Sequence, residues 1–276
     1  MSELATLQDK QDTRRHRLLA LPAIVIMVVL GLIPLMIVVV YSFLKSGEYG
    51  GVVPQFSLEA YVSLLFQRDM FDDTLTFSPA YLEIYVRTAI FGVVTTVLCL
   101  LVGFPTAYFM ATRPADKRNL WVLLLTIPFW SNLLVRTIAV MFIIRDEGLI
   151  NTILLDLGII NQPITLLFTN FAILLGLVYS FLPFMVLPIY ASLEKFDFRL
   201  AEAGFDLYAN RFQVLTKIII PLAKPGIVTG SILVFVPALS SYVVPRVLGG
   251  GKNLMVGNLI ELQFGQGRNW PLGASL

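Results

Sequence analysis

The chain has 276 residues, of which 57% are apolar and 14% are charged, and its mean hydropathy is +0.80. Soluble domains are about 45–50% apolar and about 25% charged, so this composition excludes a water-soluble enzyme and a disordered protein. The net charge is only +2, and one cysteine with one histidine cannot build a disulfide or a metal cluster, so we expect no nucleic-acid partner, no metal site and no cofactor.

Five apolar runs are long enough to cross a bilayer as helices. A spanning helix needs about 20 mostly apolar residues, and a backbone in lipid must satisfy its own hydrogen bonds, which excludes an open strand. The predicted spans are residues 18–44, 89–110, 120–144, 171–193 and 225–244. The first run is too long for a signal peptide, whose apolar region covers about 7–15 residues, so we interpret it as a retained anchor.

The distribution of Lys and Arg predicts which segments lie in the cytoplasm. With the N-terminus inside, the inner segments are residues 1–17, 111–119 and 194–224, and they hold 12 of the 20 Lys and Arg residues. We therefore expect residues 1–17 to form a cytoplasmic tail and residues 18–276 to form a multi-pass membrane domain. The residues from Trp270 onward resemble the start of another apolar run, so we expect a sixth helix that the sequence stops short of.

The longest inner loop, residues 194–224, carries an amphipathic stretch. Its apolar side chains recur at steps of three and four residues, which is typical of a helix with one apolar face. These side chains are Phe198, Ala201, Phe205, Tyr208, Phe212 and Leu215. Such a helix at the inner face suits docking into a groove of a cytoplasmic partner, and it equally suits an interfacial helix that lies on the membrane.

The same stretch resembles the EAA motif of permeases from ABC importers. That motif consists of Glu-Ala-Ala, three residues, Gly, nine residues and Ile-x-Leu-Pro. Glu202 and Ala203 match its start. Ile218, Ile220 and Pro221 match its end, with Ile220 in place of Leu.

Two positions depart from the motif. Gly204 stands where the second Ala belongs, and Tyr208 stands where the family has the Gly of a turn. A Tyr with a positive φ is strained. We therefore expect either a helical turn at Tyr208 or a different local geometry.

Further stretches resemble the spermidine/putrescine branch of these permeases. They are residues 127–136, 182–185, 193–195, 249–260, 263–264 and 268–274. The resemblance implies an all-α integral membrane fold, the MetI-like bundle of type I ABC importers. It also implies import of polyamines across the bacterial inner membrane, with another small solute for the same kind of importer as the alternative.

The resemblance implies partners as well. Two cytoplasmic ATPase subunits, a second homologous permease and a periplasmic substrate-binding protein are expected beside the lipid bilayer. Residues 249–253 lack the P-loop pattern, so we expect a separate subunit to hydrolyse ATP and this chain to perform no catalysis. The residues implied to couple the chain to the ATPases are Glu202, Ala203, Gly204, Phe205, Asp206, Leu207, Tyr208, Ile218, Ile220 and Pro221.

Four residues within the spans are candidates for the transport pathway. Trp130 and Asn132 lie near Pro128 in the middle of the third predicted helix. Arg136 is the one charge well within a span, and Tyr179 lies in the fourth span. A charge at bilayer depth faces the bundle or water. Arg136 therefore lines a pathway or subunit interface, or it is a structural residue that is capped by carbonyls or extends to the outer membrane surface. An aromatic face suits the ammonium groups of a polyamine, with packing as the alternative for Trp130.

The predicted spans contain no Asp or Glu. Ion-coupled secondary transporters use such carboxylates, which argues against that class, and no set of catalytic groups surrounds the single histidine to indicate a membrane enzyme. A carboxylate for a cationic substrate then comes from a second permease, the binding protein or an outer loop. For Tyr190 and Tyr242 we favour packing or a position at the membrane interface. The outer acids that are candidates for contact with a binding protein are Asp69, Asp72, Asp73, Asp146 and Glu147.

Gly226 and Gly230 form a small-xxx-small step at the start of the fifth predicted span. Such a step lets two helix backbones approach closely. We therefore predict a tight helix contact at this position, with contact between subunits as the alternative.

Overall fold

The computed structural model describes residues 2–47, 49–68 and 75–276. It is mostly helical, which confirms the predicted fold class. The chain divides into two compact units, one comprising residues 1–78 and 262–276 and the other comprising residues 79–261. Three of the outer acids, Asp69, Asp72 and Asp73, lie outside the described residues.

The first unit begins with the long helix α1, Ser2–Ser42. Its strands form two antiparallel pairs, β1 with β2 and β3 with β4. The C-terminal helix α13, Trp270–Ser275, packs against α1, where the ring centroids of Tyr41 and Trp270 lie 6.2 Å apart. The short elements of this unit are β1 (Leu44–Ser46), β2 (Val52–Phe56), α2 (Glu59–Val62), β3 (Phe66–Arg68) and β4 (Leu75–Phe77).

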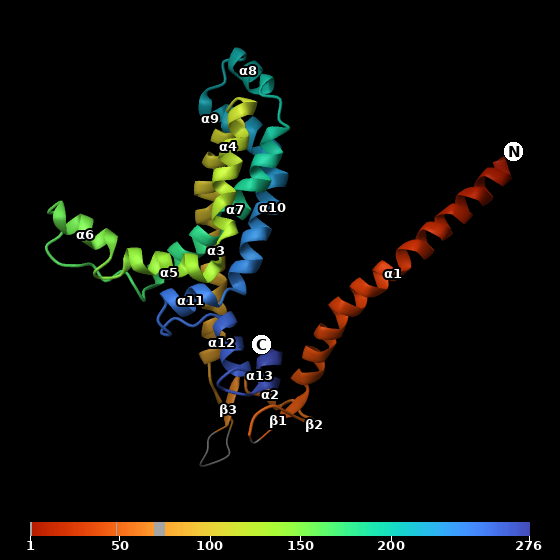
Figure 1. Ribbon diagram of the computed structural model, residues 1–276, viewed down its shortest axis with the longest axis vertical. Coiled ribbons are helices and arrows are strands. Elements are labelled where there is room, and N and C mark those ends of the chain that lie inside the picture. Colours follow the sequence, from red (N-terminus) through yellow and green to blue (C-terminus); the bar gives the residue numbers. More distant parts are fainter. Residues whose placement is uncertain (1, 48, 69–74) are drawn as a thin grey trace. The chain divides into compact units, whose positions relative to one another are not determined.

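Three long helices form the body of the second unit. They are α3 (Ala80–Ala111), α7 (Asn170–Glu194) and α10 (Ile220–Leu239), and they pack against one another (Figure 1). The shorter helices are α4 (Ala115–Thr126), the 3-10 helix η1 (Ile127–Trp130), α5 (Leu133–Ile144), α6 (Leu149–Asp156), α8 (Arg199–Asp206), α9 (Arg211–Val214), the π-helix η2 (Leu215–Ile219), α11 (Val243–Leu248) and α12 (Val256–Phe264).

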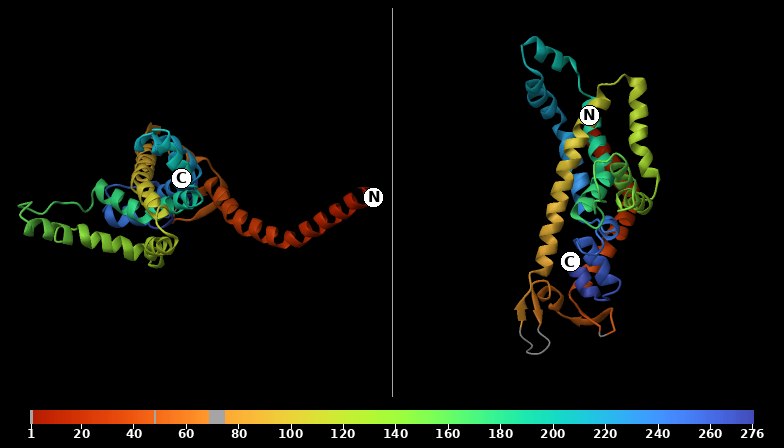
Figure 2. Two further views of the ribbon diagram at one scale, coloured as in Figure 1. Left: turned by 90° about the horizontal axis from the view of Figure 1, so that it is seen from above. Right: turned by 90° about the vertical axis from the view of Figure 1, so that its left-hand side faces the viewer.

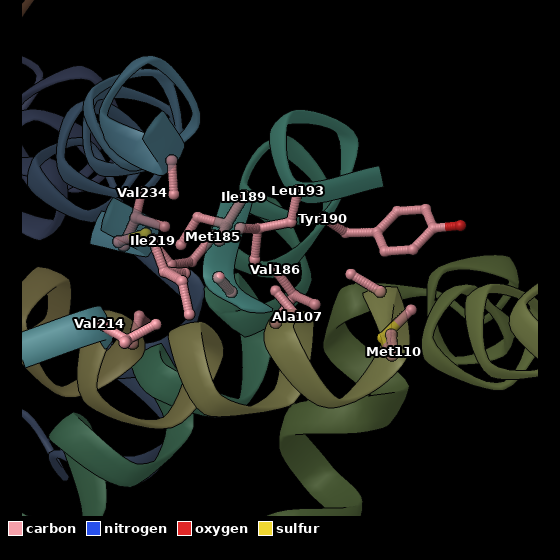
Figure 3. Close-up of a cluster of buried hydrophobic side chains, with 14 residues drawn as sticks. Ala107, Met110, Met185, Val186, Ile189, Tyr190, Leu193, Val214, Ile219 and Val234 are labelled. Carbon is pink, nitrogen blue, oxygen red and sulfur yellow. The ribbon is translucent and has the colours of Figure 1, made fainter. Parts of the chain in front are cut away.

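Helix α7 supplies the centre of the core of this unit. Its side chains of Met185, Val186 and Ile189 are fully buried. They form one cluster with Ala107 of α3 and Val234 of α10 (Figure 3). Because lipid chains are as apolar as these side chains, close van der Waals packing rather than transfer from water holds the three helices together.

The predicted tight contact at Gly226 and Gly230 is confirmed. A Cβ atom at Gly226 would lie 2.4 Å from the carbonyl oxygen of Pro188, and one at Gly230 would lie 3.0 Å from Sδ of Met185. Both partners belong to α7. The step therefore lets α10 approach α7 more closely than any larger residue would allow.

Among the described residues, four helices are long and apolar enough to cross a membrane. They are Ala20–Ser42, Ala80–Ala111, Asn170–Glu194 and Arg211–Leu239. A fifth span is reached if the bent pair formed by residues 116–130 and 133–156 counts as one crossing.

The bent pair differs from the single helix predicted over residues 120–144. The two halves meet at 94°. Pro128 has no N–H for the helical ladder, and its ring disfavours the preceding helical turn. The side chain of Asn132 then accepts the N–H of Leu134 at 2.8 Å and caps a new helix, α5. The helix is therefore interrupted at this point, because Pro128 ends one helix and Asn132 starts the next.

The fifth predicted span, residues 225–244, is also displaced. Helix α10 starts earlier, at Ile220, and ends at Leu239. The carbonyl oxygen of Tyr242 accepts a hydrogen bond of 2.8 Å from Nδ2 of Asn258, a partner outside the helix. The chain therefore turns after α10, and residues 243–248 form the separate helix α11, which packs against α5 and α7.

Candidate functional site

The stretch that resembles the EAA motif, residues 196–221, lies at one end of the second unit, where α8 and α9 extend past α3 and α7 (Figures 1 and 2). The carboxylate of Asp197 accepts the N–H of Arg199 at 3.0 Å at the start of α8. Asn210 and Gln213 exchange hydrogen bonds of 2.8 and 2.9 Å and cap α9. The capping box of Asn210 and Gln213 starts a new helix at Arg211, which explains why the amphipathic stretch forms two short helices instead of one. We call residues 196–221 the EAA-like segment.

Helix α8 ends in a Schellman turn. The N–H of Ala209 donates to the carbonyl oxygen of Gly204 at 3.1 Å, and the N–H of Tyr208 donates to that of Phe205 at 2.9 Å. Tyr208 adopts a φ of +61°. The expectation of a helical turn or another geometry is therefore wrong, because the left-handed turn is kept and Tyr208 carries its steric cost of about 1–2 kcal/mol.

The second departure from the motif, Gly204, has a packing reason. A Cβ atom at Gly204 would lie 2.8 Å from Cδ1 of Ile218 and 3.3 Å from Cγ2 of Val214. The space that the methyl group of an Ala would occupy at position 204 is thus taken up by the side chains of Ile218 and Val214. Gly204 and Ile218 are complementary, so the two ends of the EAA-like segment are held together across α9.

The EAA-like segment is anchored in the helix bundle. Ala201 and Val214 are buried in the same core cluster as the residues of α3 and α7. The ring of Phe198 meets that of Tyr108 in α3, with centroids 6.3 Å apart. A pocket of about 400 Å³ lies between α3 and the segment and is lined by Tyr108, Ala201, Phe205, Arg211, Val214, Leu215 and Ile219. The segment therefore contacts α3 and α7 through buried side chains at the edge of this pocket.

The outer face of the EAA-like segment carries exposed apolar side chains beside two acids. Leu207, Tyr208 and Phe212 are 82%, 98% and 72% exposed. Glu202 and Asp206 are exposed on α8. Large apolar side chains grouped at the end of a unit, next to charges, are typical of a surface that contacts another protein.

The end of the motif lies where α9 passes into α10. Leu215–Ile219 form the π-helix η2, and Pro221 follows in the first turn of α10. A proline removes one helical hydrogen bond and crowds the carbonyl of the fourth residue before it. The wider π-turn accommodates this ring without breaking the helix, so the EAA-like segment continues into a membrane-spanning helix.

Two of the predicted pathway residues, Trp130 and Asn132, lie in the break between α4 and α5 rather than in mid-helix. Trp130 ends η1 and is 79% exposed. Asn132 uses its side-chain oxygen for the cap of α5. An exposed Trp at a helix break is available to a partner or to solute, whereas the amide of Asn132 has a structural hydrogen bond.

Arg136 is held by an aromatic pair. Its guanidinium carbon lies 5.4 Å from the ring centroid of Phe129, and that ring packs edge to face on Phe184 of α7, with centroids 5.0 Å apart. Nε of Arg136 is buried and has no hydrogen-bond partner among the described residues. A ring face offsets part of the cost of burying this cation. The contacts of the described residues do not bring Tyr179, which is 43% exposed, to this cluster.

A second pocket, which no sequence pattern indicated, lies at the other end of α10. It has a volume of about 650 Å³ and is lined by Leu239, Ser240, Tyr242, Arg246, Val256, Gly257, Ile260 and Glu261. Arg246 and Glu261 form an ion pair there. These two residues stand 15 positions apart on different helices, so no periodic pattern in the sequence links them.

Residues 93–269 match the family model described as binding-protein-dependent transport system inner membrane component. The chain belongs to this family.

This permease family includes curated relatives that match most of the chain. The spermidine/putrescine transport system permease protein PotB of Escherichia coli K12 is 39% identical over 88% of this chain and 84% of its own length. The protein of the same name from Haemophilus influenzae is 38% identical over 89% of this chain and 82% of its own length. The inner membrane ABC transporter permease protein YdcU of Escherichia coli K12 is 30% identical over 72% of this chain and 67% of its own length.

A solved structure shares the permease fold. The crystal structure of a bacterial ABC transporter that imports the acidic polysaccharide alginate matches with a TM-score of 0.66 at 16% identity, over 98% of this chain and 91% of that chain. A second structure, of a bacterial alginate ABC transporter in complex with an alginate pentasaccharide-bound periplasmic protein, matches with the same TM-score over 96% and 88%. At this identity the likeness supports the fold alone.

Proposed function

We propose that the chain is a membrane-spanning permease subunit of an ATP-driven importer that moves polyamines, spermidine or putrescine, into the bacterial cytoplasm. The observation that carries the proposal is the 39% identity over 88% of the chain with a curated spermidine/putrescine permease. The EAA-like segment, anchored in the bundle and exposed at its outer face, supports the ATP-driven mechanism.

The importer is a complex. Two cytoplasmic ATPase subunits, a second homologous permease and a periplasmic binding protein complete it, and this chain is a transport subunit that hydrolyses no ATP. Its N-terminus lies in the cytoplasm, consistent with the excess of Lys and Arg in the inner segments. The end of the second unit with α8 and α9 then faces the ATPases, and the end with α11 and α12 faces the periplasm.

The EAA-like segment couples ATP hydrolysis to transport. Glu202, Ala203 and Asp206 contact the ATPase, and Phe205, Leu207 and Tyr208 are the apolar anchors. Gly204, Ile218, Ile220 and Pro221 hold the shape of the segment and join it to α10. When the ATPases close on ATP, the segment moves with them, and its packing on α3 and α7 turns the bundle between inward-facing and outward-facing states.

The break between α4 and α5 contributes to the pathway. Trp130 offers an aromatic face to the ammonium and methylene groups of the substrate. Asn132, in the same break, and Tyr179, on α7, are the other polar residues that we assign to the pathway. Arg136 would repel a polyamine, so its role is to hold the break against α7 through Phe129.

Uptake competition tests the substrate. Cells that lack their own polyamine importers and carry the complete operon are given radiolabelled spermidine, with and without excess unlabelled putrescine, spermidine or a neutral amino acid. We expect the two polyamines to compete and the amino acid to leave uptake unchanged. Uptake that does not depend on this chain, or that polyamines fail to reduce, refutes the polyamine assignment while leaving the family intact.

Charge reversal tests the coupling surface. Glu202→Lys should reduce co-purification of the ATPase subunits and abolish uptake, because it places a cation on the face that contacts them. Asp156→Lys makes a matching charge reversal at an exposed position at the end of α6, outside the EAA-like segment, and should retain both. Equal behaviour of the two variants contradicts the assignment of Glu202.

A further inference from the structure

The pocket at the end of α10 contains a carboxylate, which the spans predicted from the sequence lack. Its volume is about 650 Å³, which is within the range of small-molecule sites. Leu239, Val256 and Ile260 give it apolar walls, and Glu261 is the one carboxylate of its lining. Apolar walls with a single anionic group suit a chain of methylenes that ends in an ammonium group.

An aromatic ring lies in the same lining. Tyr242 is 47% exposed and lines the pocket, so part of its ring is open to a ligand, which agrees with the interfacial position that the sequence allowed beside packing. A cation over a tyrosine face gains electrostatic attraction in addition to its contact with a carboxylate. Glu261 and Tyr242 together therefore offer two kinds of attraction to one ammonium group.

Glu261 is paired with a cation of the chain itself. Arg246 of α11 forms an ion pair with it, and the two side chains are 58% and 39% exposed. Ion pairs with this exposure contribute about 0–1 kcal/mol, since water and salt screen them. Another cation can therefore replace Arg246 at small cost, and the guanidinium can turn to solvent.

The frame of the pocket is rigid. Nδ2 of Asn258 donates to the carbonyl oxygen of Tyr242 at 2.8 Å, and the N–H of Val256 donates to Oγ1 of Thr88 in α3 at 3.0 Å. A Cβ atom at Gly257 would lie 2.8 Å from the carbonyl oxygens of Ser240 and Ser241. These contacts fix α12 to the end of α10, so Glu261 and Tyr242 are held in place before a ligand arrives.

We propose that this pocket is a cation-binding site in which Glu261 and Tyr242 bind one ammonium group of the substrate, and in which Arg246 holds Glu261 until that group replaces it. The site supplies the carboxylate that is absent from the predicted spans. Exchange of one cation for another at Glu261 keeps the carboxylate paired throughout, which avoids the cost of an unpaired charge. The inference rests on the proposed import of polyamines.

One helix, α10, connects the site to the end of the unit that is proposed to face the ATPases. Ser240 and Leu239 of its lining terminate α10, and the other end of α10 continues through η2 into the EAA-like segment. The 20 residues of α10 span about 30 Å as a single helix. Loss of the Arg246–Glu261 pair on substrate entry therefore changes the contact between α11 and α12, beside one end of the helix whose other end continues into the EAA-like segment.

Two substitutions at the ion pair separate binding from structure. Glu261→Gln and Arg246→Gln both break the pair, so a purely structural role predicts the same effect for both. The proposal predicts opposite effects on the initial rate of spermidine uptake by cells with the complete importer at saturating spermidine. Glu261→Gln should lower the maximal rate by about fivefold, the upper value of a cation–carboxylate contact at this exposure, while Arg246→Gln keeps or exceeds the wild-type rate. The half-saturating concentration should stay unchanged in both, because the binding protein is unaltered.

Glu83→Gln is the matched control. Glu83 forms an exposed ion pair with Arg87 in α3, outside the pocket, and its loss should leave uptake at the wild-type rate. The amount of permease–ATPase complex recovered in detergent reports folding for all three variants. Equal losses for Glu261→Gln and Arg246→Gln, or wild-type uptake by Glu261→Gln, overturn the site. Absence of polyamine uptake by the wild-type importer instead overturns the proposed function, so the two failures are distinguishable.

Discussion

Replacement of Tyr208 by Gly should stabilise the end of α8, although it removes a large side chain. Tyr208 has a φ of +61° and is 98% exposed. The substitution therefore relieves about 1–2 kcal/mol of left-handed strain and loses almost no buried contact within the chain. Glycine also raises the entropy of the unfolded chain, which reduces this stabilisation by about 0.4–1 kcal/mol. The net stabilisation of the turn is about 1 kcal/mol, which corresponds to about fivefold slower local opening.

Amide hydrogen exchange of the permease subunits purified without the ATPases measures this effect, because the side chains of Leu207 and Tyr208 then contact no ATPase. The N–H groups of Tyr208 and Ala209 close the turn, and a peptide that covers them should exchange about fivefold more slowly in Tyr208→Gly. Leu207→Gly is the matched control, since Leu207 is 82% exposed and has an ordinary φ of −86°, so glycine there should speed exchange. Tyr208→Ala removes the ring but keeps the strain, and it should exchange like the wild type. Exchange that is unchanged or faster in Tyr208→Gly refutes the reasoning.

Three further predictions concern packing. Gly226→Val should prevent α10 from approaching α7 and lower the melting temperature and yield of the complex in detergent, whereas Gly31→Val, where a Cβ atom has no neighbour within 4 Å, should leave both unchanged. Met185→Ala should cost about 2–5 kcal/mol, because the side chain is fully buried, and Met27→Ala, at a position 75% exposed, should cost little by the same thermal assay. Asn151 is buried and exchanges hydrogen bonds of 2.9 and 3.0 Å with the backbone of Ile164. Asn151→Ala should therefore loosen the segment after α5 and speed its cleavage by limited proteolysis, while uptake falls less than in Glu202→Lys.

Helix content, the tight contact of α10 with α7 and the type of protein could be predicted from local sequence. Apolar runs of about 20 residues have one stable form in lipid. A small-xxx-small step likewise has one common use, which is why Gly226 and Gly230 were assigned correctly. The caps at Asn132 and Asn210 were present in the sequence, but a cap competes with an unbroken apolar run, and hydropathy alone cannot decide between them.

Two local features were predicted wrongly or missed because they depend on distant residues. The turn at Tyr208 was expected to lose its left-handed form, yet its hydrogen bonds and the packing of Ala201 and Val214 in the core hold it. The space at Gly204 is filled by Ile218, 14 residues away in the sequence. Tyr208 keeps its turn against a left-handed cost of about 1–2 kcal/mol, and Gly204 is kept in α8 against a helical cost of about 0.5–1 kcal/mol.

The sequence by itself determined that this protein lies in a membrane, that one of its loops carries an amphipathic, charged segment, and which family that segment resembles. These properties follow from hydropathy, charge and short spacings, which act over one or two helical turns. Only the tertiary structure decided that the third run breaks, that α8 and α9 pack on α3 and that Arg246, Glu261 and Tyr242 share a pocket. Those facts depend on which side chains meet across different helices, and no local interaction specifies such a meeting.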